Sequence, residues 1–80
     1  MNKNYKIITI AKYIVEQDAL CFEETGCPMG TGDLRGMIDC DDDFRDLYRI
    51  LMGEEIEHGS RGLETLVFKL AHALVKEVLG

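Results

Sequence analysis

The sequence predicts an α+β fold, in which a short N-terminal antiparallel β-hairpin and a third strand pack on two C-terminal helices. Three observations support this prediction. β-branched and aromatic residues dominate positions 5–17, glycines and one proline crowd positions 26–36, and apolar residues follow helical spacing from residue 42 onward. The 80 residues form a single small domain, 1–80, and chains this short bury only about 60% of their unfolded surface.

The N-terminal third reads as two strands, 5–10 and 13–17, because Ile, Val, Thr and Tyr favour extended backbone. A third strand is expected around residues 35–39, after a glycine-rich turn at 30–33 in which the backbone needs positive φ. The alternative is an all-α helical bundle. It rests on apolar residues that would share one helix face, namely Ala11, Ile14, Val15, Ala19 and Phe22.

A helix is predicted from about Asp42 to Glu55. Its apolar stripe consists of Phe44, Leu47, Tyr48 and Leu51. The acidic run at 41–43 precedes it, where the positive end of the helix dipole favours carboxylates. Arg45 and Arg49 lie three or four residues from aspartates, so we expect ion pairs along this helix.

A second helix is predicted over Leu63–Leu79 and is apolar on more than one side. The main stripe consists of Leu63, Leu66, Val67, Leu70, Leu74 and Val78, and a flanking stripe consists of Phe68, Val75 and Leu79. Only a narrow polar strip remains, made of Thr65, Lys69, His72 and Lys76. A helix of this kind is buried on several sides, so we expect a homodimer with Phe68, Val75 and Leu79 at its interface.

The charge distribution excludes a nucleic-acid binder. Fifteen acidic residues face nine basic ones, a net charge of −6, and fourteen of the acids lie between residues 16 and 64. Such a field repels nucleic acid and favours a basic protein surface; the alternative is that the acidic charge only keeps a small protein soluble. The chain shows no apolar run of the ~18 residues that a membrane span needs and no signal-peptide pattern. An odd number of cysteines (Cys21, Cys27 and Cys40) predicts reduced thiols and a cytoplasmic location.

Motifs for cofactors and catalysis are incomplete. The glycine-rich stretch lacks the Gly-Lys-Ser/Thr of a phosphate-binding loop. The alternating aspartates at 39, 41 and 43 lack the glycine and glutamate of a calcium loop. The three cysteines, His58 and His72 lack the spacing of a zinc site. We therefore expect no cofactor, no catalytic residue and no enzymatic activity.

The motif "EEIEH" offers a metal-binding alternative. Glu55 and His58 would share a helix face, as in di-iron helical bundles. A homodimer would supply the second copy, and Glu23 or Glu24 would add a carboxylate if the N-terminus were helical. Because Gly59 and Ser60 follow at once, a histidine at a helix C-terminus is the favoured interpretation.

The segments "NYKIITIAKYIVEQ", "RGMID" and "FRDLYRILMGEEIEHGSRGLETLVFKLAHALV" resemble small phage and prophage proteins of uncharacterised function. This group includes anti-CRISPR inhibitors that occupy the basic nucleic-acid surface of a host nuclease. The cysteine- and glycine-rich stretch 21–34 departs from the pattern. The resemblance implies a small α+β protein that acts by binding another protein.

The sequence thus predicts a non-enzymatic, acidic protein-binding module, with a purely structural small dimer as a further alternative. Its partner would be the basic surface of a host protein, of which a nuclease complex is one example. The expected contact residues are acids that no nearby basic side chain obviously neutralises: Glu16, Asp18, Glu23, Glu24, Glu54, Glu55 and Glu57.

Overall fold

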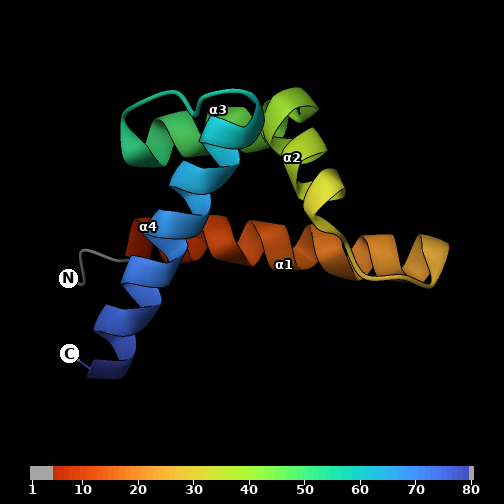
Figure 1. Ribbon diagram of the computed structural model, residues 1–80, viewed down its shortest axis with the longest axis horizontal. Helices are drawn as coiled ribbons and strands as arrows, with labels where there is room; N and C mark the ends of the chain where they lie inside the picture. Colours follow the sequence, from red (N-terminus) through yellow and green to blue (C-terminus); the bar gives the residue numbers. More distant parts are fainter. Residues whose placement is uncertain (1–4, 80) are drawn as a thin grey trace.

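The computed structural model describes residues 5–79, with the side chains of residues 5–76, and over this range helices are its only regular secondary structure (Figure 1). The four helices are α1 (Tyr5–Thr25), α2 (Thr31–Cys40), α3 (Asp42–Met52) and α4 (Gly59–Leu79). The predicted α+β fold is therefore wrong, and the all-α alternative is confirmed. The expected strands 5–10 and 13–17 lie within α1, and the expected strand 35–39 lies within α2.

Helix α1 forms because its core residues are spaced by three and four positions. Ile7 and Ile10 are buried, and Tyr13 and Ile14 pack against the same core. This spacing places them on one helix face, where β-branched side chains gain more from burial than they lose in helix propensity. The face that the sequence indicates shares only Ile14 with these core residues, and its members Val15 and Phe22 are 65% and 57% exposed.

Two short polar contacts organise the turn between α1 and α2. Gly26, at φ 76°, ends α1 in the left-handed conformation that glycine favours. The Asp18 carboxylate then accepts a hydrogen bond from the Met29 N–H at 2.7 Å. At the start of α2, the Gly30 N–H donates to the Asp33 carboxylate at 3.0 Å. The expected positive φ at residues 30–33 is wrong, because the left-handed residue is Gly26.

Helix α3 begins where the sequence predicted. The Asp41 carboxylate accepts a hydrogen bond from the Phe44 N–H at 3.2 Å, which caps the helix. The predicted stripe is confirmed, since Phe44 and Tyr48 are fully buried while Leu47 and Leu51 are partly buried. The helix ends at Met52, because Gly53 adopts a φ of 75° and its N–H donates to the Arg49 carbonyl at 2.9 Å.

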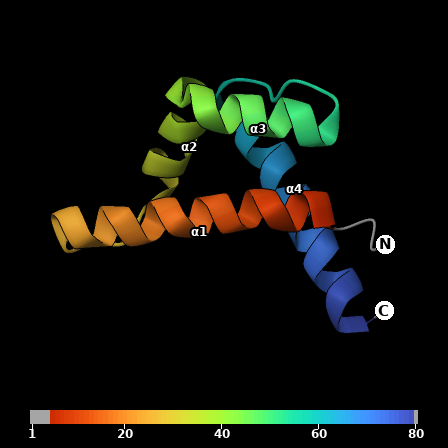
Figure 2. The same cartoon turned by 180° about the vertical axis from the view of Figure 1, so that it is seen from behind.

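The four helices surround one core. Helix α1 contacts both α3 and α4, and helix α2 does the same. The core contains Ile7, Ile10, Ile38, Phe44, Tyr48, Ile56, Leu66 and Ala73. Helix α4 crosses α1 near the start of α1, and its C-terminal part extends past the crossing (Figures 1 and 2). Within residues 5–79, no helix combines the length and apolar character of a membrane span.

Candidate functional site

The loop between α3 and α4, residues 53–58, has a firmly anchored backbone. Its Ile56 side chain is 3% exposed and belongs to the core. The Arg45 guanidinium donates to the Ile56 carbonyl at 2.9 Å and to the Ile38 carbonyl at 2.7 Å. Arg45 therefore ties α2, α3 and this loop together. Of the two arginines considered for ion pairs along α3, Arg45 is directed at these carbonyls instead.

The far end of the loop is fixed by Asp39 of α2. Its carboxylate accepts a hydrogen bond from the Gly59 N–H at 2.7 Å, at the start of α4, and lies 3.4 Å from His58 Nδ1. The Gly59 N–H lowers the pKa of Asp39, with smaller contributions from His58 and Arg35. Asp39 thus caps α4 from a neighbouring helix. Sequence reasoning missed this cap because it placed residue 39 in a strand, and His58 precedes α4 rather than ending α3.

Glu54 is one of the predicted partner-binding acids, and it already has a partner within the chain. The Lys69 ammonium lies 2.5 Å from its carboxylate and 3.1 Å from the Tyr48 hydroxyl. The hydrogen bond from Lys69 lowers the pKa of Glu54. For Lys69, burial opposes the charged form, but the contacts with Glu54 and Tyr48 outweigh it and raise the pKa. The expectation that Glu54 has no basic neighbour is therefore wrong.

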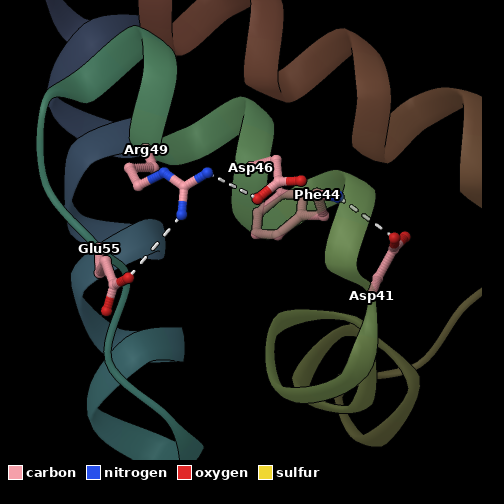
Figure 3. Close-up of polar contacts among 5 residues, drawn as sticks. All are labelled: Asp41, Phe44, Asp46, Arg49 and Glu55. Carbon is pink, nitrogen blue, oxygen red and sulfur yellow. Dashed lines mark hydrogen bonds and ion pairs between the residues drawn. The ribbon is translucent and has the colours of Figure 1, made fainter.

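Glu55 and Glu57 point outward from the same loop. Glu55 is 75% exposed, and its carboxylate lies 4.0 Å from an Arg49 nitrogen. Arg49 pairs more closely with Asp46 at 2.9 Å, the predicted ion pair along α3 (Figure 3). Glu55 therefore has a basic neighbour, contrary to expectation, although a distant and exposed one. Together with residues of α3, it lines a hollow of about 310 Å³ bounded by Asp42, Arg45, Asp46, Arg49, Glu55 and Ile56.

The remaining predicted acids lie on the second half of α1. Glu16, Glu23 and Glu24 are exposed, whereas Asp18 is half-buried and holds the Met29 N–H. Figure 1 places the end of α1 and the α3–α4 loop at well-separated ends of the molecule. The seven acids therefore form two groups rather than one continuous surface, and their role in partner binding stays a prediction.

The metal-binding alternative loses its structural basis. Residues 53–58 are not helical, so Glu55 and His58 do not share a helix face. His58 instead faces Asp39. Within the described range 5–79, no three His, Cys, Asp or Glu side chains are grouped to hold a metal ion. Glu23 and Glu24 lie at the distant end of α1.

The predicted dimer residues on α4 are accessible where the structure describes them. Phe68 is 71% exposed and Val75 is 52% exposed, and the Phe68 ring stacks on His72 with centroids 6.1 Å apart. The side chain of Leu79 lies outside the described residues. Exposure alone does not test the predicted interface on α4, which stays a prediction.

No family model matches this chain, and the searches of curated proteins and of solved structures give no match. A functional proposal therefore has to rest on the surfaces described above, and chiefly on the anchored acidic loop.

Proposed function

We propose that this protein is a non-enzymatic protein-binding module, and that the acidic surface of α3 and the loop 53–58 binds a basic surface of its partner. The observation that carries this proposal is the position of Glu55 and Glu57. Both are exposed, on a loop whose backbone is held by Ile56, Arg45 and Asp39. An anchored loop loses little conformational freedom when a partner binds, which favours affinity.

The charge balance of this surface supports a basic partner. Residues 41–58 contain seven acids against Arg45 and Arg49. Arg45 is directed at two backbone carbonyls, so it contributes little charge to the outer surface. The resulting negative potential would steer a basic protein toward the loop and raise its association rate.

The class of partner follows from this chemistry. Exposed basic surfaces in proteins are commonly those that bind the phosphates of nucleic acid, and the resemblance to phage proteins implies such a target. The three cysteines are all free thiols, which suits a reducing cytoplasm. In this proposal the protein is an inhibitor that competes with nucleic acid for a host protein.

The test compares two charge reversals of equal size. Glu55→Lys with Glu57→Lys alters the loop, while Glu23→Lys with Glu24→Lys makes the same change at the far end of α1. We expect immobilised wild-type protein to retain basic nucleic-acid-binding proteins from a host lysate. The loop variant should lose them, and the α1 variant should keep them. Added salt or DNA should release the retained proteins.

Circular dichroism of both variants provides the fold control, because all four side chains are exposed. The proposal is contradicted if the loop variant retains the same proteins as wild type. It is equally contradicted if retention resists salt and DNA, since an electrostatic contact with a phosphate-binding surface would not.

A further inference from the structure

Helix α1 has a second apolar stripe that faces away from the core. In Figure 2 this helix runs unobstructed across the front of the molecule. Successive members of the stripe are three or four residues apart, which places them on one face. Val15 and Phe22 are 65% and 57% exposed, Ala19 is also exposed, and Ile8 and Ala11 are half-buried. The stripe is Ile8, Ala11, Val15, Ala19 and Phe22.

The stripe is symmetric about its central residue. Ala11 and Ala19 lie four residues before and after Val15, and Ile8 and Phe22 lie seven residues before and after it. When two such helices run antiparallel, Val15 meets Val15 of the second copy, Ala11 meets Ala19, and Ile8 meets Phe22. Small alanines between larger residues allow two helices to approach closely and interdigitate.

The charges of α1 favour the same antiparallel arrangement. Its first half, residues 5–15, carries Lys6 and Lys12 and no acid, whereas residues 16–25 carry four acids and no base. Antiparallel pairing places the basic half of each helix beside the acidic half of the other. Lys12 and Glu16 both flank the stripe on one side, so Lys12 of each copy lies beside Glu16 of the other. A parallel pair would align like charges.

An apolar groove continues the stripe toward α4. It has a volume of about 440 Å³ and lies between α1 and the second half of α4. Its walls include Ile8, Ala11 and Val15 of the stripe, with Leu70, Ala73 and Leu74 of α4 among the remainder. In the antiparallel pair, Phe22 of the second copy faces Ile8 and so reaches this groove. The pairing therefore gives an exposed aromatic ring an apolar site.

We propose that this chain forms a two-fold symmetric homodimer through antiparallel packing of α1, with Val15 at the two-fold axis. This inference goes beyond the proposed function, because it concerns a different surface and does not involve the acidic loop. It also differs from the interface predicted from sequence, which lies on α4. A two-fold contact of this kind is closed, so it stops at a dimer.

The first experiment measures the mass of full-length variants by size-exclusion chromatography with light scattering, over a concentration series. Val15→Glu would bury two facing carboxylates at the axis, and we expect the dissociation constant to rise about tenfold or more. Phe68→Glu is the matched control, since it places the same charge on the exposed part of α4. It should leave the dimer intact.

The second experiment locates the axis by cross-linking. Val15→Cys is made in a chain whose three native cysteines are replaced by serine, and mild oxidation should yield a disulfide-linked dimer. Ile50→Cys is the control, because Ile50 is 74% exposed on α3 and lies outside the stripe. It should remain largely monomeric under the same oxidation. Exchanging Lys12 and Glu16 preserves the ion pair and should preserve the dimer, whereas Lys12→Glu alone should weaken it.

Three results would overturn the proposal: a monomeric wild-type chain throughout the series, a dimer that Phe68→Glu disrupts and Val15→Glu does not, or equal cross-linking through positions 15 and 50. Circular dichroism of each variant separates loss of the dimer from loss of the fold. The acidic loop is unchanged in all of these variants, so failure here leaves the proposed function to its own test.

Discussion

The two ends of α4 lie in very different surroundings. At its start, Asp39 caps the helix and Arg45 holds the preceding loop by its carbonyl groups. Farther along, Val67, Phe68, Leu74 and Val75 are each more than half exposed. The first end is stabilised by contacts within the chain, and the surrounding surface is acidic. The second end has apolar side chains that contacts within the chain leave largely exposed.

The first end of α4 is the well-packed one. The largest expected effect on its stability comes from Gly62→Ala. A Cβ at this position would overlap the Glu57 carbonyl and press on Ile38. The anchored loop would have to move, so we expect a loss of about 3 kcal/mol in the free energy of unfolding. Chemical denaturation measures this loss.

Gly36→Ala is the matched control for that substitution. It lies within α2, and a Cβ there meets nothing within 4 Å. Alanine forms helix better than glycine, so this variant should gain up to about 1 kcal/mol. A similar change in stability for both variants would show that the close approach at Gly62 is not a constraint.

A smaller effect is expected when Arg45 is replaced by methionine. The variant keeps the apolar stem and loses the two hydrogen bonds to the carbonyls of Ile38 and Ile56. A charged donor of this kind contributes about 2 kcal/mol. The midpoint of urea denaturation should fall accordingly.

Arg49→Met provides the comparison for Arg45. Arg49 is 54% exposed and pairs with Asp46 at the surface, a contact expected to contribute at most about 0.5 kcal/mol. Equal losses for the two arginine variants would mean that Arg45 does not hold the loop.

The parts of the fold that could be predicted from sequence are those set by local signals, and the parts that depend on packing against other helices could not. Helix α3 was predictable, because its acidic start and its stripe are local signals. Helix α1 was assigned to strands, because β propensity describes single residues and the helix is stabilised by core contacts of Ile7 and Ile10. Four members of its outward stripe, Ala11, Val15, Ala19 and Phe22, lie on the helix face that the sequence indicates. Only the structure shows that this face is exposed and that Ile14 packs against the core instead.

The candidate site was predictable only in part. The exposure of Glu55 and Glu57 follows from residue type, since glutamates are almost always solvated. The contacts that hold the loop could not be inferred, because Asp39 and Arg45 act on residues eleven to twenty positions away. The sequence shows Lys69 only as part of a polar strip, because its contacts with Tyr48 and Glu54 depend on how α4 packs.

A smaller loss than that for Arg45→Met is expected where α1 joins the well-packed start of α4. The Tyr13 hydroxyl donates to the Asp41 carboxylate at 2.7 Å, the same carboxylate that caps α3. Tyr13→Phe removes this bond and should lower the free energy of unfolding by about 1 kcal/mol near neutral pH. Urea denaturation of the two proteins measures the difference.

The difference between wild type and Tyr13→Phe should also depend on pH. Burial, followed by the hydrogen bond to Asp41, raises the pKa of Tyr13 from 10.0 to about 12. The folded state holds the hydroxyl proton of Tyr13 more tightly than the unfolded state does. The contribution of Tyr13 to the free energy of unfolding is therefore complete below pH 10.0 and is lost as the pH rises toward about 12. The two proteins should therefore converge in stability over this pH interval. The tyrosinate absorbance that appears at the high-pH end of the wild-type titration should be missing from Tyr13→Phe. A constant difference across the same pH range would mean that the hydroxyl is not bonded to Asp41 in solution.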